Sequence, residues 1–287
     1  MDSLTRPQPT VRPGVPADGE AFSYLRSLVL DRAAIFLDAD KEYLVEARLS
    51  PLARRHGAAT VWEFLLRLRA QPEGTLHTEV VEAMTTNETS FFRDPVLFNG
   101  IRDTIIPDLV TRRSQERRLT IWSAACSTGQ EPYSMAMLLR EHPQVPPSWQ
   151  VRILATDLSR PVLARARDGR FTKLEVNRGL AANRLLRWFS QVGSDWVISD
   201  ELKRMVDCRE FNLAGPWSLV PPADLVLMRN VLIYFPPEIK QKMLARVRQV
   251  LRPDGYLVLG NAETTLNLDS NFQRVDIGGA SAFRLTT

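Results

Sequence analysis

The chain has 287 residues, of which 44% are hydrophobic and 24% are charged, a composition typical of a globular protein with one large domain or two moderate ones. No apolar run approaches the roughly 20 residues that span a bilayer, the N-terminus lacks a signal-peptide pattern, and two cysteines make no disulfide framework. We therefore expect a cytoplasmic protein without direct membrane insertion. The net charge of +4 is compatible with a nucleic acid, a membrane face or an acidic protein as partner.

Histidine and cysteine are too few and too dispersed to indicate a metal site. The three histidines and two cysteines are not spaced like zinc ligands along the chain. They are His56, His77, His142, Cys126 and Cys208. We therefore predict no metal. Cys126 has no histidine near it in sequence, so we interpret it as a small turn residue rather than as a nucleophile.

The N-terminal third of the chain is predicted to be helical. Residues 1–19 hold four prolines and little apolar content, which is typical of a flexible tail. Residues 20–84 carry apolar residues at helical spacing and predict an all-α domain. Within it, residues 41–70 hold six Lys/Arg against three acids, either as a solvated helix surface or as a docking face. Residues 85–118 then form a linker with a helix over 95–113.

From residue 119 to residue 287 the pattern changes to strands that alternate with helices, which predicts a second, α/β domain. Residues 119–124 predict a buried strand, residues 125–131 a tight turn of small side chains, and Pro132 the first residue of a helix. A second strand over 151–158 contains Asp157 near its end. Because nucleotide-like ligands lie outside the carboxyl ends of such strands, Asp157 is placed to accept hydrogen bonds from ribose hydroxyls.

The alternation continues to the end of the chain. The further predicted elements are a helix over 159–169, strands over 205–213 and 223–235, a helix over 236–251, a turn at 252–255, a strand over 256–260 and a hairpin over 271–286. The interval of about 170–204 breaks this rhythm and contains a strand-like segment at 196–199, so we expect an inserted small antiparallel β-subdomain.

The turn after the first strand favours a cationic ligand over a dinucleotide. A dinucleotide-binding turn carries G-x-G-x-x-G, whereas this turn has only Gly129 and also carries Glu131. S-adenosyl-L-methionine has ribose hydroxyls, an ammonium and a sulfonium but no phosphate. The order of elements is that of class I S-adenosylmethionine-dependent methyltransferases, an α/β fold with a doubly wound sheet that ends in an antiparallel hairpin.

Five motifs occur in the order seen in one family: TTNETSFFRD at 85–94, WSAACSTGQEPYSMA at 122–136, LATDLS at 154–159, FNL at 211–213 and RNVLIYF at 229–235. In these motifs the chain resembles the CheR family of chemotaxis receptor glutamate methyltransferases over about residues 22–285. The resemblance implies an N-terminal all-α domain and a catalytic domain with an inserted β-subdomain, which agrees with the pattern above.

The resemblance also implies the site residues. It assigns cofactor contacts to Asn87, Thr89, Arg93, Glu131, Asp157, Asn212, Leu213, Arg229 and Asn230, and catalytic roles to Arg93 and Tyr234. Structural alternatives stay open. The segment TTNET at 85–89 could be only a capping sequence at the start of a helix. Glu131 and Asp157 could serve only the starts of helices, Leu213 could be core, and Tyr234 could be an aromatic residue packed at a strand end.

The implied reaction is methyl transfer from S-adenosyl-L-methionine to chemoreceptor glutamates, with S-adenosyl-L-homocysteine as product. A glutamate carboxylate has a reference pKa of about 4.3, so it is already an anionic nucleophile near neutral pH. We expect a monomer that docks on the acidic cytoplasmic helical bundle of methyl-accepting chemotaxis proteins through Arg48, Arg54 and Arg55. The short loop at 190–195 favours an enzyme that needs no receptor tether peptide.

Two other functions are considered. The first is a nucleic-acid methyltransferase. Base methyltransferases carry N/D-P-P-Y/F after the fourth strand, whereas this chain has RNVLIYF there, which argues against this function. The second is a non-catalytic module that binds S-adenosyl-L-methionine, against which the full set of motif residues argues.

Overall fold

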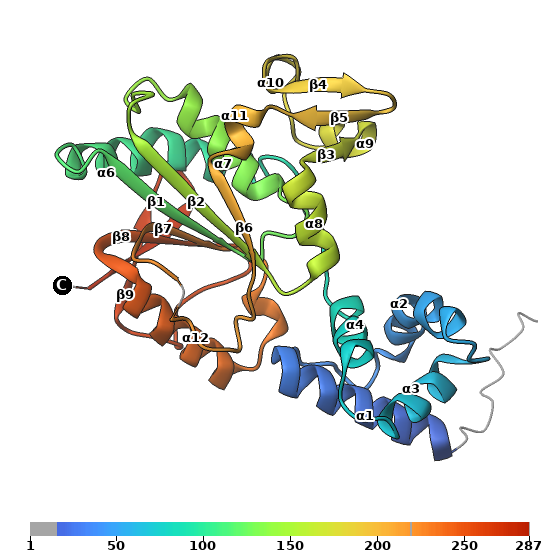
Figure 1. Cartoon of the computed structure of the whole chain (residues 1–287). Coiled ribbons are helices and arrows are strands. Elements are labelled where there is room, and N and C mark those ends of the chain that lie inside the picture. The colour runs from blue at the N-terminus through green and yellow to red at the C-terminus, as the bar shows by residue number, and fades with distance from the viewer. Residues whose placement is uncertain (1–15, 219, 287) are drawn as a thin grey trace, which may run out of the picture. The chain divides into compact units, whose positions relative to one another are not determined.

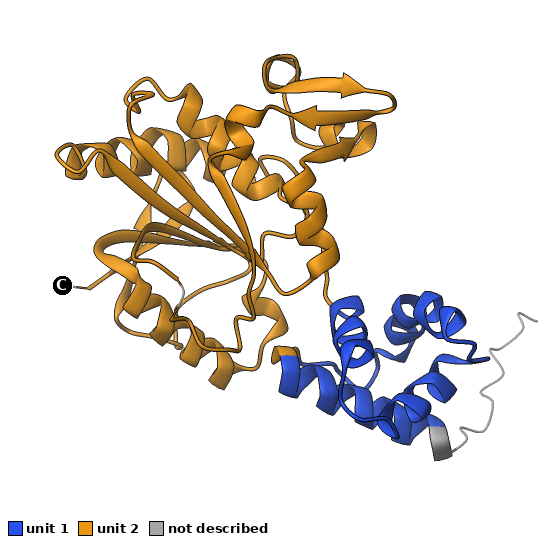
Figure 2. Cartoon of the chain, viewed as in Figure 1, with its two compact units in different colours: residues 1–32, 36–84 blue, residues 33–35, 85–287 orange. Residues whose placement is uncertain are grey.

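The computed structural model describes residues 16–218 and 220–286, which form two compact units. The first unit comprises the chain up to Arg32 together with residues 36–84. The second unit comprises residues 33–35 and 85–287 (Figure 2). Most of the tail expected over 1–19 lies outside the described residues. Its boundary was wrong, because the first helix begins at Pro16, a residue that a first helical turn accommodates without loss of a hydrogen bond.

The described part of the first unit contains four helices: α1 (Pro16–Ala33), α2 (Glu42–Arg55), α3 (Val61–Arg69) and α4 (Thr75–Ala83). Each helix buries an apolar face, and Phe22 of α1 packs edge-on against Trp62 of α3 with ring centroids 6.1 Å apart. The side chain of Thr60 caps α3 by accepting from the backbone N–H of Glu63 at 3.0 Å. Capping and apolar packing together explain why this short segment forms helices.

After the segment 85–94, the second unit forms one continuous helical run in three parts: α5 (Pro95–Gly100), a π-helical stretch (Ile101–Ile105) and α6 (Ile106–Arg112). Pro107 lacks the N–H that would bond the carbonyl of Asp103, which interrupts the helical ladder at this junction. Gly100 lies against the backbone of Ile277, where an added Cβ would stand 2.0 Å from the carbonyl oxygen. Only a glycine allows this close approach.

The sheet has seven strands in the order β6-β2-β1-β7-β8-β10-β9. The pairings from β6 to β8 are parallel, and β10 runs antiparallel to both of its neighbours. The strands are β1 (Arg118–Ala124), β2 (Gln150–Asp157), β6 (Val206–Glu210), β7 (Ala223–Met228), β8 (Leu251–Leu259), β9 (Phe272–Asp276) and β10 (Ser281–Leu285). This topology confirms the predicted class I methyltransferase fold.

Helices cover both faces of the sheet, so its central strands carry buried apolar residues on both sides. The covering helices include α6, α7 (Gln130–Glu141), α8 (Arg160–Asp168) and α12 (Pro237–Val250). Figure 1 shows α6 and α7 on one side of the sheet and α12 on the other. Alternate residues of β7 belong to different apolar clusters, Leu225 and Leu227 to one and Val226 and Met228 to the other.

Three predicted boundaries were wrong. Helix α7 begins at Gln130 rather than at Pro132, because Gly129 takes φ 98° and the chain enters the helix immediately afterwards. The turn expected at 252–255 lies within β8 as an irregularity between the pairs Ala223–Leu251 and Leu225–Tyr256. The strand expected over 223–235 ends at Met228 and is followed by the short 3-10 helix η2 (Leu232–Tyr234).

The inserted β-subdomain forms a separate three-stranded antiparallel sheet in the order β3-β5-β4. Its elements are β3 (Arg170–Thr172), α9 (Lys173–Asn177), α10 (Ala182–Trp188), β4 (Phe189–Val192), β5 (Asp195–Ile198) and α11 (Asp200–Lys203). Phe91 is fully buried against Phe171 and Phe189, with centroid distances of 5.0 and 5.6 Å. In the described part of the chain, no helix has the length and apolar character needed to cross a membrane.

Candidate active site

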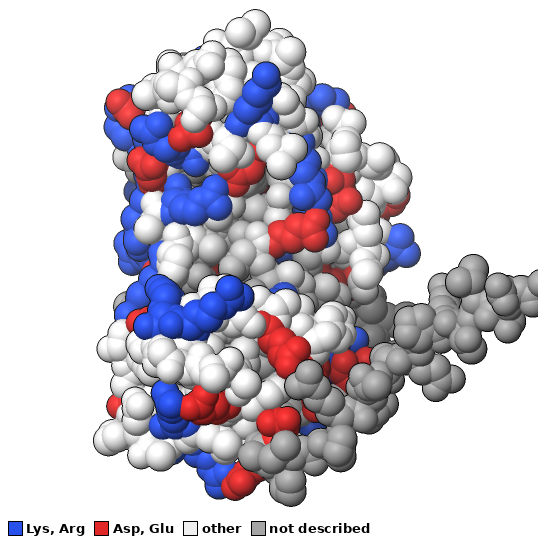
Figure 3. Space-filling model, turned by 90° about the vertical axis from the view of Figure 1, so that its right-hand side faces the viewer, with Lys and Arg blue, Asp and Glu red and all other residues white. Residues whose placement is uncertain are grey.

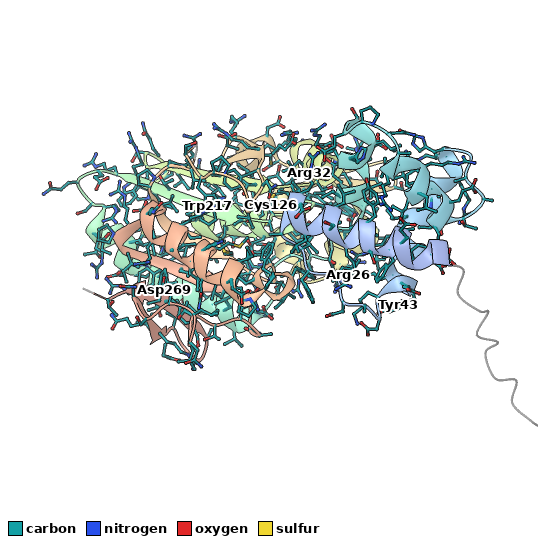
Figure 4. All side chains as sticks on the ribbon, turned by 90° about the horizontal axis from the view of Figure 1, so that it is seen from below. Arg26, Arg32, Tyr43, Cys126, Trp217 and Asp269 are labelled. Atoms are coloured by element: carbon teal, nitrogen blue, oxygen red, sulfur yellow. The ribbon has the colours of Figure 1, made fainter. Side chains whose placement is uncertain are left out.

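The turn after β1 is a compact backbone loop fastened to the end of β2. Ala125, Ser127 and Gly129 all have positive φ, at 59°, 51° and 98°. The backbone N–H of Cys126 donates to the carbonyl of Thr156 at 2.8 Å. Burial raises the pKa of the Cys126 thiol well above its usual value, so this side chain, labelled in Figure 4, stays protonated.

Asp157 at the end of β2 holds this turn through its carboxylate. One carboxylate oxygen accepts from the backbone N–H of Ser127 at 2.8 Å, and the other accepts from Ser159 at 3.0 Å. Burial raises the pKa of Asp157, while the backbone N–H groups of Ser159 and Ser127 oppose that shift. Asp157 therefore takes part in the start of α8, and its oxygens retain lone pairs for a further donor.

The segment 85–94 reaches the same turn through Ser127. The Ser127 hydroxyl donates to the carbonyl of Asn87 at 2.8 Å. Asn87 and Asp157 thus belong to one hydrogen-bonded group, with half-buried Thr89 two residues farther along. The backbone N–H of Phe92 donates to the Ser134 hydroxyl at 2.9 Å, which attaches the end of this segment to α7.

Arg229, which follows β7, joins two of the predicted site residues and a third residue, Asp94. Its guanidinium donates to the Glu131 carboxylate at 3.0 Å, to the backbone carbonyl of Arg93 at 2.8 Å and to the Asp94 carboxylate. Glu131 also accepts from the Ser123 hydroxyl at 2.7 Å. We call the side chains of Arg229, Glu131 and Asp94 the Arg229 cluster. Its one cation and two carboxylates give a net charge of −1.

The Arg229 cluster has unused bonding capacity. The side chain of Arg229 is 2% exposed. Within the described residues its Nε is buried and has no hydrogen-bond partner. A buried donor without a partner is costly, so an acceptor brought against this atom would remove that cost. A net negative cluster with one free donor fits a ligand end that carries both a cation and a carboxylate.

The two predicted catalytic side chains are not joined to this cluster. The Arg93 guanidinium donates to the carbonyl of Glu88 at 3.2 Å, and only its backbone carbonyl bonds Arg229. Tyr234 is half-buried in η2, and its hydroxyl makes no hydrogen bond to the part of the chain that the structure describes. Tyr234 therefore keeps its hydroxyl available, whereas one nitrogen of the Arg93 guanidinium is already bonded.

The loop after β6 lies beside the end of β2, because the backbone N–H of Phe211 donates to the carbonyl of Asp157 at 2.8 Å. In this loop the Asn212 side chain accepts from the backbone of Ala214 at 2.9 Å. Leu213 is buried in the apolar cluster that contains Trp217, so the packing alternative describes its side chain. Trp217, labelled in Figure 4, donates to the Leu213 carbonyl at 2.9 Å.

Sequence reasoning missed two carboxylates that organise the site. Asp94 ends the motif at 85–94 and bonds Arg229. Glu263 follows β8 and accepts from the backbone of Asn230, the predicted site residue that has a φ of 57°. The signal for Glu263 was its place after a parallel strand, the same rule that identified Asp157.

The three arginines of the predicted docking face differ in their surroundings. Arg48 is half-buried and donates to the carbonyl of Met84, so it helps to hold α2 against the end of α4. Arg54 and Arg55 are exposed in the last turn of α2, where Arg55 lies 3.8 Å from Glu79. On the face of the chain drawn in Figure 3, basic side chains alternate with acidic and neutral ones.

Comparison with known proteins gives the family. The family model "CheR methyltransferase, SAM binding domain" matches residues 87–279, and "CheR methyltransferase, all-alpha domain" matches residues 20–85. "Chemotaxis protein methyltransferase Cher2" of Pseudomonas putida is 38% identical over 88% of this chain and 94% of its own. "Chemotaxis protein methyltransferase" of Escherichia coli is 33% identical over 88% of this chain and 86% of its own. The chain therefore belongs to the CheR methyltransferase family, with its all-α and S-adenosylmethionine-binding domains.

Proposed function

We propose that this methyltransferase transfers a methyl group from S-adenosyl-L-methionine to glutamate side chains of chemoreceptors, forming methyl esters and S-adenosyl-L-homocysteine. The names of the relatives support the chemotaxis pathway. The observation that carries the chemistry is the Arg229 cluster, whose net charge of −1 and free Nε suit a cationic methyl donor with a carboxylate.

The residues present fit S-adenosyl-L-methionine on both sides of the β1 turn. Glu131 and Asp94 would face the cationic methionyl end, and Arg229 Nε would donate to its carboxylate. Asp157 would accept from the ribose hydroxyls through its remaining lone pairs. Asn87, Thr89, Asn212, Leu213 and Asn230 complete the proposed cofactor contacts.

The chain's own part in the reaction is orientation and exclusion of water. When bound, S-adenosyl-L-methionine supplies a methyl group on a sulfonium, which an ionised glutamate can attack without a general base. The Arg93 guanidinium would align that carboxylate by a charge-assisted, fork-like contact. Tyr234 would present its ring or hydroxyl beside the transferred group. Effective molarities of about 10⁵–10⁸ M show how much orientation alone can contribute.

The substrate is proposed to be the cytoplasmic helical bundle of a chemoreceptor, which also places the reaction in the cytoplasm. Acidic residues of the bundle would dock on the exposed Arg54 and Arg55, with Arg48 at the edge of this surface. Strands β4 and β5 are joined by only two residues, Gly193 and Ser194, which supports an enzyme that works without a receptor tether peptide.

The test is a methyl-transfer assay with labelled S-adenosyl-L-methionine on receptor-containing membranes and on RNA, followed by mass-spectrometric mapping of the modified residues. We expect glutamate methyl esters on receptors and no label on RNA. Arg93→Ala should abolish turnover while cofactor affinity is largely retained, because the bond from Arg229 to residue 93 involves the backbone. Label on RNA would favour the nucleic-acid alternative, and cofactor binding without any transfer would favour a non-catalytic module.

A further inference from the structure

The Glu263 carboxylate is surrounded by four backbone N–H groups at the carboxyl ends of the neighbouring strands β7 and β8. One carboxylate oxygen accepts from Asn230 and from Gly260, both at 2.7 Å. The other accepts from Val231 at 2.9 Å and from Ile233 at 3.3 Å. A single side chain thus connects the end of β8 with three amides of the segment that follows β7.

That segment, residues 229–235, carries three of the proposed site residues. Arg229 begins it, Asn230 follows in the left-handed region at φ 57°, and Tyr234 lies in η2 near its end. Asparagine adopts this conformation more readily than most non-glycine residues, but a restraint is needed to make it the single conformation here. The bonds from Asn230 and Val231 to Glu263 supply such a restraint at the point where the chain leaves the sheet.

Gly260 shows how closely the two strand ends approach each other. An added Cβ at this position would lie 2.8 Å from the Glu263 carboxylate and 3.0 Å from the backbone nitrogen of Asn230. Since real Cβ atoms do not come so close to fixed groups, a side chain at 260 would push the segment away from Glu263. Both the absence of a side chain at residue 260 and the carboxylate of Glu263 therefore keep segment 229–235 close to the end of β8.

We propose that Glu263 is a positioning residue for methyl transfer, holding segment 229–235 so that Arg229 and Tyr234 face the reacting groups. This inference rests on the proposed function. The role requires a carboxylate, because glutamine has one acceptor oxygen and a donor NH₂ group. In Glu263→Gln two of the four backbone N–H groups would face donors, and the segment would shift.

The variants Glu263→Gln and Gly260→Ala test this role by different routes, one removing the acceptor and the other crowding it. Both should lower kcat by about 10- to 100-fold, because small misplacements of reacting groups are costly. The KM for receptor should change little, because the docking arginines lie in the other unit. Glu263→Asp, which keeps the charge on a shorter stem, should regain part of kcat. Glu238→Gln, at an exposed acid in the first turn of α12, is the matched control.

Hydrogen–deuterium exchange supplies a readout independent of turnover. Peptides covering 229–235 should exchange faster in Glu263→Gln than in wild type, while peptides of β1 and β2 should not change. If exchange and kcat were unaltered in both variants, the inference would be overturned. The proposed function would still stand in that case, provided that the wild type methylated the receptor. If the wild type itself methylated no receptor, the proposed function would fail, and exchange of 229–235 would still decide whether Glu263 holds the segment.

Discussion

Replacing Arg113 with methionine is expected to destabilise the catalytic unit strongly, although this residue lies outside the proposed site. The Arg113 side chain is 5% exposed and donates to Asp224 at 2.6 Å and to both oxygens of Asp254 at 2.8 and 2.5 Å. Asp224 is 1% exposed and also accepts from the backbone of Thr120 at 2.8 Å. The substitution would leave the buried Asp224 carboxylate without its main cation.

The expected magnitude follows from what remains around Asp224. Removing one partner of a buried pair costs about 3–5 kcal/mol, since the other charge is left uncompensated. The backbone N–H of Thr120 stays in place, and Arg252 Nε lies 3.4 Å from Asp224. These contacts offset part of the loss, so we expect about 3 kcal/mol, the lower end of that range. Arg252→Met should cost about 1 kcal/mol or less, because its closer pair with Glu116 is exposed.

Urea unfolding followed by tryptophan fluorescence measures this difference, because every tryptophan except Trp62 lies in the catalytic unit. The hydrogen bond from Arg113 lowers the pKa of Asp254. A carboxyl with a lowered folded-state pKa stabilises above its unfolded pKa of about 3.9, and this contribution is lost as pH falls through the folded value. The difference in the free energy of unfolding between wild type and Arg113→Met should therefore become smaller below about pH 4. A loss under about 1 kcal/mol at neutral pH, or no more than for Arg252→Met, would refute the reasoning.

Two further predictions concern binding. The double variant Arg54→Gln and Arg55→Gln should raise the KM for receptor several-fold at low salt with kcat unchanged, and the effect should shrink as salt screens the exposed charges; an unchanged KM would remove these residues from docking. Asp157→Asn should weaken cofactor affinity by roughly tenfold or more, the worth of a charge-assisted hydrogen bond. Because burial raises the pKa of Asp157, wild-type affinity should fall as pH decreases through that raised value, and calorimetry should find no such dependence in the variant.

The elements predicted best from the sequence were those whose signal is local. Strands β1 and β2 are apolar runs that end in turn residues, and α8 has Ser159 before it and Gly169 after it, the latter at φ 64°. The boundaries that failed depend on distant partners. Residues 252–255 resemble a turn in composition, but pairing of Leu251 with Ala223 extends β8 across them.

The candidate site divides along the same line. Asp157 and Glu131 could be located because each stands in or beside the turn that follows a predicted strand. The bonds that join Arg229 to Asp94 and Glu131 span 135 and 98 residues, so no sequence window contains both partners. The same holds for Arg48. Its charge led to the prediction of a docking face, but in the structure its side chain donates to the carbonyl of Met84, 36 residues away.

The contact of Gly100 with Ile277 also orders events during synthesis. The helical run that starts beside Asp94 rests on a hairpin that is translated much later than the run itself. Strand β10 then inserts between β8 and β9, and the hairpin of β9 and β10 completes the support for a helical segment translated much earlier. A nascent chain that stops before this hairpin would thus carry every proposed ligand contact and still lack the support that holds Asp94 beside Arg229.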